Sequence, residues 1–332
     1  MSNKRKKCVN CNTDNRNSKR RCTNCSSEFP LTQGNNRIFL QEIRKAGEYG
    51  HVSPTLRLSI QNGADVNMLS SRIVPSTGLM EAAAAGNRHI VQFLIGLPAI
   101  NINQQTTFGR TALWFAANGG YHRCVEILLT TPSIAVNHQD VHGITALMIA
   151  ARQGRHMTVQ RLLQFERTDV NIQDEHGQTA LFITAGLYRP QTITTMVHWH
   201  LRQRALGLNR CLDVNIQTDN GSTALMRAVT YNKPTNVMML LSIHELNIVC
   251  MDNMGNTALT IPLIQKGAQN ILRSWHRRMA NRVHRWQYLA RRKRRRREKG
   301  LSKYISRKKN TPHGPERHIG DFLQHSFIKL RF

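Results

Sequence analysis

The chain has 332 residues, of which 40% are hydrophobic, and a formal net charge of +28. It contains no run of 18 apolar residues, so we expect no membrane-spanning helix. No apolar signal segment follows Met1, only the basic run 4–7, so we expect an intracellular protein whose cysteines stay reduced.

The positive charge is concentrated at the two ends of the chain. Residues 1–35 carry a net +6, residues 36–268 a net +5, and residues 269–332 a net +17. A uniformly basic middle would have indicated nucleic acid bound there, and this distribution argues against it. We therefore expect the two ends of the chain, rather than its middle, to bind polyanions.

Two C-x2-C pairs lie near the N-terminus and comprise Cys8, Cys11, Cys22 and Cys25. Four thiolates at this spacing can hold one tetrahedral zinc ion, which would order a segment too short to bury a core. The alternative is a pair of disulfides, which needs an oxidising compartment. The sequence therefore predicts a basic finger over residues 1–35 with one structural zinc as its cofactor.

The string CVNCNTDNRNSKRRCTNCSSEF resembles a small zinc ribbon. Its spacing also fits the Ran-binding-protein type of finger, with Asn15 at that family's asparagine. Lys6 stands where that family carries a tryptophan, and no aromatic residue lies between the cysteines. We therefore favour a generic ribbon, without the stacking of RNA bases on an aromatic ring.

The phrase G-x-T-A-L recurs through the middle of the chain. It starts at Gly109, Gly143, Gly177, Gly221 and Gly255, and successive copies are 34, 34, 44 and 34 residues apart. A weaker copy, Thr77-Gly78-Leu79, has its threonine 34 residues upstream of Thr111. A repeat of this length indicates stacked units that bury their apolar faces against one another.

The copy at Gly143 shows what each unit contains. Thr145 is placed to cap a short helix that Gly154 ends and that contains Leu147, Ile149, Ala150 and Ala151. Val159, Leu162 and Leu163 follow the spacing of a second helix. Helix, turn, helix and hairpin within about 33 residues resembles the ankyrin repeat. The resemblance implies an all-α solenoid of about six to seven repeats over residues 36–275, including a degenerate first repeat.

This sequence departs from the T-P-L-H signature of the ankyrin family. Alanine replaces the proline, and the histidine becomes Trp114, Met148, Phe182 and Met226 in successive copies. We expect these apolar side chains to fill the space that the histidine would occupy.

The 44-residue step places ten extra residues between Leu187 and Leu212. Apolar residues at helical spacing predict a second helix lengthened by nearly three turns. His198 and His200, with Cys211 nearby, are an alternative metal site. Residues two apart on a helix face different sides, so we favour packing.

The C-terminal segment combines an apolar stripe with many arginines. The stripe runs through Leu272, Trp275, Met279, Val283, Trp286 and Ala290. It predicts a basic amphipathic helix over residues 269–299 that covers the end of the stack. Residues 300–332 have the composition of a disordered tail.

Seven consecutive basic residues lie within this segment: Arg291, Arg292, Lys293, Arg294, Arg295, Arg296 and Arg297. Such a run binds an import receptor, the phosphates of RNA or DNA, or a membrane surface. We favour nuclear import, and so expect the protein in the nucleus, the cytoplasm or both.

The sequence contains no P-loop, no G-x-S-x-G and no H-E-x-x-H, and we expect no enzymatic activity. The ankyrin resemblance implies a monomeric adaptor that holds a protein partner on its hairpin tips and inner helices. The positions matching that surface are Phe108, Arg110, His142, Ile144, Arg152, Gln153, His176, Gln178, Tyr231, Met254 and Asn256. The alternative is a regulator whose finger and arginine-rich helix bind RNA or DNA.

Overall fold

The computed structural model describes residues 30–47, 50–70, 75–261 and 267–280. The chain divides into two compact units, Met1–Leu272 and Arg273–Phe332, and the repeats lie in the first. The four cysteines expected to bind zinc and the basic run 291–297 fall outside the described residues.

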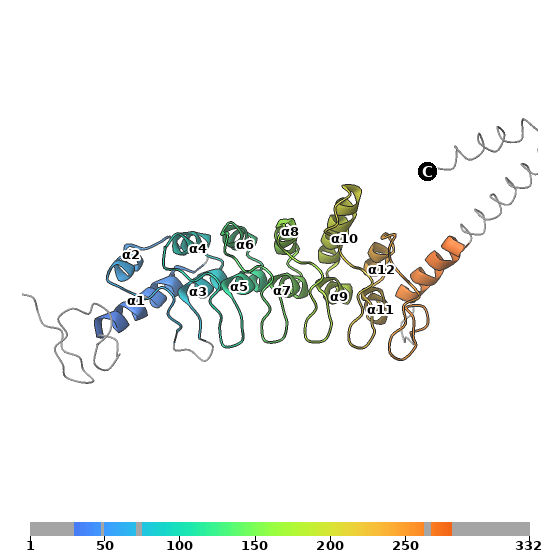
Figure 1. The fold of residues 1–332 in the computed structure, drawn as a ribbon, viewed down its shortest axis with the longest axis horizontal. Helices are drawn as coiled ribbons and strands as arrows, with labels where there is room; N and C mark the ends of the chain where they lie inside the picture. Colours follow the sequence, from blue (N-terminus) through green and yellow to red (C-terminus); the bar gives the residue numbers. More distant parts are fainter. Residues whose placement is uncertain (1–29, 48–49, 71–74, 262–266, 281–332) are drawn as a thin grey trace, which may run out of the picture. The chain divides into compact units, whose positions relative to one another are not determined.

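The repeats stack their helices in two rows (Figure 1). The inner row comprises α1 (Pro30–Ala46), α3 (Gly78–Ala85), α5 (Ala112–Gly119), α7 (Ala146–Arg152), α9 (Ala180–Ala185) and α11 (Ala224–Thr230). The outer row comprises α2 (Pro54–Gln61), α4 (Arg88–Ile95), α6 (His122–Leu129), α8 (His156–Gln164), α10 (Pro190–Ala205) and α12 (Pro234–Leu240). Each inner helix packs on the next inner helix, and from α4 onward each outer helix packs on the next. The described residues contain no β-strand, which confirms the expected all-α solenoid.

The threonine of each repeat begins an inner helix. Five inner helices, α3 to α11, follow a threonine whose hydroxyl accepts the amide three residues on. In α7 the amide of Met148 donates to Oγ1 of Thr145 over 3.2 Å. This bond satisfies one of the amides that the first turn leaves unpaired. Thr257 differs, because only a single turn follows it in the described residues.

The core lies between the two rows. Alanine pairs on the inner helices are buried and allow neighbouring repeats to approach closely. The four residues that replace the family's histidine are also buried: Trp114, Met148, Phe182 and Met226 are 9%, 1%, 7% and 2% exposed. These apolar side chains therefore pack into the core of the stack, which agrees with the expectation.

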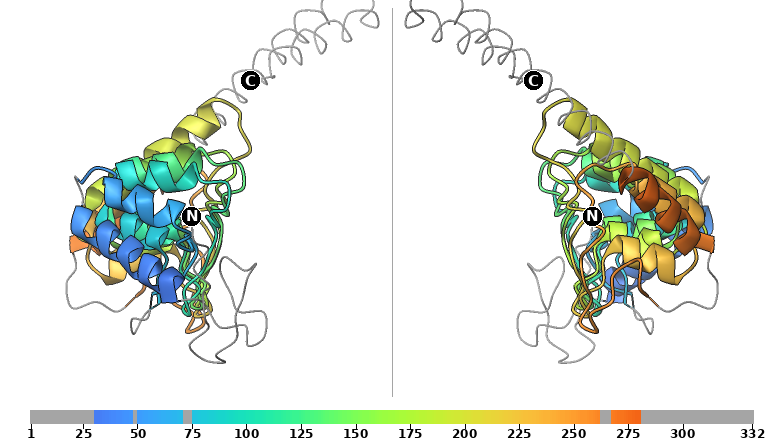
Figure 2. Two further views of the ribbon diagram at one scale, coloured as in Figure 1. Left: turned by 90° about the vertical axis from the view of Figure 1, so that its left-hand side faces the viewer. Right: turned by 90° about the vertical axis from the view of Figure 1, so that its right-hand side faces the viewer.

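The glycine of the repeated phrase lets consecutive hairpins touch. Gly143 has φ +73°, and a Cβ there would lie 2.8 Å from the amide nitrogen of Glu175 in the next hairpin. That amide donates to the carbonyl of His142 over 3.2 Å. The hairpins lie together along one side of the helical rows (Figure 2).

An asparagine in each connection also joins neighbouring repeats. Asn103 donates from Nδ2 to the carbonyl of Ser133 over 2.7 Å and accepts the amide of Ala135 over 2.9 Å. The same pair of bonds recurs at Asn67, Asn137, Asn171 and Asn215. Each repeat is therefore tied to its immediate neighbour.

The extra residues of the 44-residue step lengthen α10, as expected. It has 16 residues, whereas α4, α6, α8 and α12 have seven to nine. The helix ends at Ala205, and Leu206 and Leu208 beyond it are exposed. His198 is exposed while His200 is buried, and the described residues hold no His, Cys, Asp and Glu cluster suited to a metal ion.

The ends of the repeat array are described only in part. Helix α1 begins at Pro30, inside the segment assigned to the finger. Residues 267–280 are helical and Leu272 is buried, but the expected capping helix beyond residue 280, with Trp286, lies outside the described residues. No helix in the described residues is long and apolar enough to cross a membrane.

Candidate protein-binding surface

An aspartate in each of three hairpins holds the hairpin in shape. The side chain of Asp140 is 2% exposed, and its Oδ1 accepts the amides of His142 over 3.0 Å and Ile144 over 2.9 Å. Asp174 and Asp252 make the same pair of bonds in their own hairpins. The hairpin tips are therefore presented in a fixed conformation.

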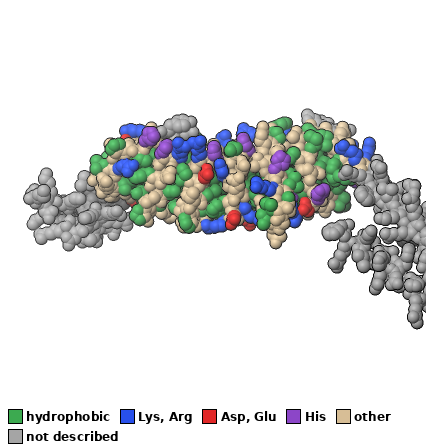
Figure 3. Space-filling model, turned by 90° about the horizontal axis from the view of Figure 1, so that it is seen from above, with side chains coloured by type: hydrophobic (Ala, Val, Ile, Leu, Met, Phe, Trp, Pro, Cys, Tyr) green, Lys and Arg blue, Asp and Glu red, His purple; other side chains and the backbone are tan. Residues whose placement is uncertain are grey.

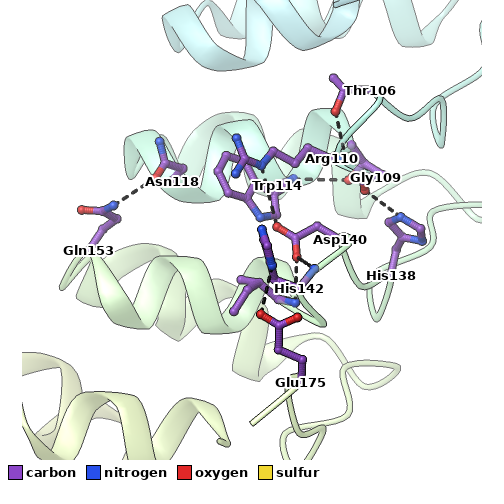
Figure 4. Close-up of polar contacts among 12 residues, drawn as sticks. Thr106, Gly109, Arg110, Trp114, Asn118, His138, Asp140, His142, Gln153 and Glu175 are labelled. Carbon is purple, nitrogen blue, oxygen red and sulfur yellow. Dashed lines mark hydrogen bonds and ion pairs between the residues drawn. The ribbon is translucent and has the colours of Figure 1, made fainter. Parts of the chain in front are cut away.

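Side chains also bridge consecutive repeats at this surface (Figure 4). Nδ1 of His142 lies 2.9 Å from Oε1 of Glu175, and Nε2 of Gln153 donates to Oδ1 of Asn118 over 3.2 Å. His142 and Gln153 were both expected to bind a partner. Their polar atoms are engaged within the solenoid, although both residues are exposed.

A first arginine–aromatic cluster lies between two hairpins (Figure 4). Cζ of Arg110 is 4.3 Å from the ring centroid of Trp114 and 5.3 Å from that of Phe108. Its Nε lies 3.7 Å from Oδ2 of Asp140 and makes no hydrogen bond. The charge is held over aromatic rings, while 31% of the side chain is exposed.

A second cluster lies on the inner helices farther along the stack. Cζ of Arg227 is 4.6 Å from the ring centroid of Phe182 and 5.3 Å from that of Tyr231. Nη1 donates to Oε1 of Gln178 over 3.4 Å, and Nε is buried with no hydrogen-bond partner. Burial lowers the pKa of Arg227, and the neighbouring charge of Arg152 lowers it further.

The expected contact residues differ in their exposure. Phe108, Tyr231 and Met254 are exposed by 41%, 54% and 86%. Ile144 is only 5% exposed, so its side chain belongs to the core and we remove it from the contact surface. The remaining members are exposed (Arg152 and His176) or half-buried (Gln178 and Asn256).

The sequence analysis missed several residues of this surface. It did not include Arg227, Asp140 or Val141, whose side chain is 57% exposed at a hairpin tip. It also missed a row of glutamines. Nε2 of Gln139 donates to the carbonyls of Gly143 and Gln173, and Gln173 and Gln217 repeat the pattern. These glutamines are 34 and 44 residues apart, so the spacing of the repeats could have revealed them.

Comparison with known proteins identifies the repeated unit. A family model described as "Ankyrin repeats (3 copies)" matches residues 44–140, 79–174 and 133–198. The solenoid is built of ankyrin repeats. The crystal structure of the ankyrin repeat domain of Bcl-3, titled a unique member of the IkappaB protein family, is similar to this chain with a TM-score of 0.57 and 20% sequence identity. The match covers 71% of this chain and 97% of that one, and no curated protein sequence matches.

Proposed function

We propose that this chain is a protein-binding adaptor that holds its partner on the hairpin tips and the inner helices. Ankyrin repeats indicate protein–protein interaction in general. The observation that supports this location is the combination of exposed apolar tips with two arginine–aromatic clusters. Arginine and aromatic residues are enriched at the centres of protein interfaces.

The two clusters offer different contacts to a partner. Arg227 is half-buried, and the accessible part of its guanidinium can donate to a carbonyl or carboxylate of a partner. At the tips, Phe108, Val141 and Met254 expose apolar surface that a partner would remove from water. Together they favour a partner with both apolar and acceptor groups.

Site-directed photo-crosslinking tests this location. A photo-reactive residue at position 108 or 254 of the full chain should form adducts with a second protein in cells. The control places the photo-reactive residue at position 157 or 238 instead. Met157 and Met238 are exposed on the outer helices α8 and α12. Equal adducts at all four positions, or adducts only at the two controls, would contradict the proposal.

Affinity measurements with the crosslinked protein then test individual residues. Tyr231→Ala and Arg152→Ala should weaken binding, because both side chains are exposed beside the second cluster. Met238→Ser should leave the affinity unchanged. Binding by Tyr231→Ala and Arg152→Ala at wild-type affinity would exclude the inner-helix surface.

The basic ends support a proposal about location. Seven consecutive basic residues over 291–297 fit an import receptor, and they also fit RNA or DNA phosphates. Replacing them with Ser and Gln should move a fluorescent fusion from the nucleus to the cytoplasm. Full nuclear accumulation after this change, and after removal of the basic run 4–7, would exclude import through either segment.

A further inference from the structure

The turns between inner and outer helices form a continuous edge. We define this turn edge as residues 85–89, 118–123, 152–156, 186–190 and 231–234. Arg155 donates from Nε to the carbonyl of Asn118 over 3.4 Å, and Arg189 donates from Nη1 to the carbonyl of Gln153 over 2.6 Å. Each turn therefore touches the preceding one.

Glycines in the turns make room for these contacts. A Cβ on Gly120 would overlap the side chain of Arg155, and one on Gly154 would overlap that of Arg189. At Gly86 the neighbouring side chain is the ring of Tyr121. The arginines and the tyrosine are thus held in fixed positions along the edge.

The turn edge carries only positive and neutral residues. Its exposed arginines are Arg88, Arg123, Arg152, Arg155 and Arg189, and its histidines are His89, His122 and His156. It contains no Asp or Glu. Of the twelve acidic residues described after residue 50, ten lie instead in the connections that carry the hairpins, and the other two, Glu81 and Glu126, lie within helices. In Figure 3, over the outer helices, Lys, Arg and His side chains extend along the row and few acidic ones appear.

The arginines of the turn edge are not neutralised within the described residues. Elsewhere in the repeats, Arg44, Arg110, Arg161 and Arg204 each lie within 4 Å of a carboxylate. None of the five exposed turn-edge arginines does. Their charge is therefore available to an external anion.

A hollow of about 400 Å³ opens in this edge between two consecutive turns. Its lining includes Arg88, His89, His122 and Arg123, and no acidic residue. Cationic and neutral donors around this recess suit a phosphate group. The ring centroids of His51 and His89 are 5.1 Å apart, which continues the row toward the first repeat.

Tyrosines lie in three of the five turns of the turn edge. Tyr188 is 88% exposed and Tyr231 is 54% exposed, while Tyr121 is half-buried over the glycines. Lys233 lies over one face of the Tyr188 ring and Arg227 over one face of the Tyr231 ring, so an unpaired base would stack on the opposite face of each ring while the arginines meet phosphates. A carboxylate-rich protein segment would use the cations but has no need of the rings.

We propose that the turn edge binds the backbone of a single-stranded nucleic acid, with phosphates on the arginines and bases on the exposed tyrosines. Two features favour this partner. The cations form a row with at least one arginine in each of four consecutive turns, and the rings are exposed within the same row. The small net charge of residues 36–268 hides this row, because the compensating acids lie mainly in the hairpin connections.

Salt-dependent binding of full-length protein to a fluorescent 20-nucleotide oligouridine tests the proposal. The edge variant replaces Arg88, Arg123, Arg155 and Arg189 by Gln. The control variant replaces Arg37, Arg57, Arg161 and Arg202, which lie in helices α1, α2, α8 and α10 outside the edge, and so loses the same charge. Both keep the basic ends, whose contribution cancels in the comparison.

The slope of log affinity against log salt should fall in magnitude by roughly 2–3 in the edge variant, since each lost phosphate contact on a single strand contributes about 0.7. The control variant should change this slope by less than about 0.7, which is the contribution of one contact. Equal slopes for the two variants would overturn the proposal. The pair Arg88→Gln with Arg123→Gln leaves both inter-turn hydrogen bonds intact and should lower the slope by about half as much, which separates lost contacts from misfolding.

Crosslinking identifies the contact and the class of partner. Oligouridine containing 4-thiouridine should crosslink to peptides holding Tyr188 or Tyr231, and Tyr188→Ala should remove the first of these. Crosslinks confined to residues 1–29 and 281–332 would contradict the proposal. So would a 20-residue oligoglutamate that binds in an edge-dependent manner while oligouridine does not, because the site would then recognise acidic protein.

Discussion

Arg227 and Phe182 belong to different repeats, and the guanidinium carbon of Arg227 lies 4.6 Å from the centroid of the Phe182 ring. Burial lowers the pKa of this arginine, and its Nε has no hydrogen-bond partner among the described residues. A cation–π contact contributes about 0.5–2 kcal/mol, which offsets only part of the cost of removing the charge from water. The solenoid therefore retains a group that its own contacts satisfy poorly.

We predict that Arg227→Met leaves the melting temperature unchanged or raises it, while binding of the protein partner weakens. Methionine keeps much of the volume and removes the buried charge. Thermal unfolding and partner affinity, measured on the same preparation, check both parts. A clear drop in melting temperature would show that Arg227 serves the fold rather than the partner.

Asn103→Ala should destabilise the repeats by about 1–3 kcal/mol, because it removes two hydrogen bonds worth roughly 0.5–1.5 kcal/mol each. The bonds join Asn103 to Ser133 and Ala135 of the next repeat. Urea unfolding measures the loss, and Gln92→Ala on the exposed face of α4 serves as the control. Equal stability of the two variants would exclude a structural contribution from this row of asparagines.

Gly143→Ala should cost more stability than Gly207→Ala. Both glycines have positive φ, so alanine at either position carries a backbone penalty of about 1–2 kcal/mol. Only at Gly143 would the Cβ also overlap the backbone of the next hairpin, adding roughly 1–3 kcal/mol. Similar unfolding free energies for the two variants would contradict the close hairpin contact.

His200 should make stability depend on pH. It is fully buried on α10, and burial lowers its pKa below the ordinary value of 6.5, although Nε2 lies 3.6 Å from Oε2 of Glu245. The folded state therefore resists protonation that the unfolded state accepts, so the unfolding free energy falls as the pH drops below 6.5. Arg204 also forms an ion pair with Glu245 over 3.0 Å, so the carboxylate is shared between Arg204 and His200.

The variant His200→Gln removes this titration and should show a smaller loss of stability between pH 7 and pH 5 than the wild type. Urea unfolding at several pH values measures it. His198→Gln, on the exposed face of the same helix, is the control and should keep the wild-type pH dependence. Parallel curves for His200→Gln and the wild type would contradict the prediction.

Purified protein should contain about one equivalent of zinc, and the double variant Cys11→Ser with Cys22→Ser should lose it. The paired C-x2-C spacing, together with the expectation that these thiols stay reduced, is the basis of this prediction. Elemental analysis gives the metal content, and thiol titration gives the number of free cysteines. Metal-free protein with two intact disulfides would contradict it.

The repeated phrase contained most of the information about the fold. Its threonines cap the inner helices and its glycines allow the hairpins to stack, both of which follow from local stereochemistry. The surface was harder to predict. Ile144 occupies a hairpin position in the sequence, yet its side chain is buried, and that depends on how the next repeat packs.

The net charge of long segments of the chain did not predict the row of arginines on the turn edge. Arg88 and Arg155 are 67 residues apart in the sequence, but the stacked turns place them in one row. The acidic residues that balance these arginines in the net charge are close to them in sequence, but most lie in the hairpin connections, away from the turn edge. Only the arrangement of the repeats shows that separation.

The row of asparagines has a consequence for how this protein can change in length. Asn171 donates to the carbonyl of Cys211 over 3.1 Å and accepts the amide of Asp213 over 2.8 Å, although ten more residues separate these partners than in neighbouring repeats. The added chain extends α10 and its exposed exit loop, and the bonds between repeats keep their pattern. Residues 206–208 are therefore a natural place to insert a reporter or an epitope, because growth at that point leaves the register of the stack intact.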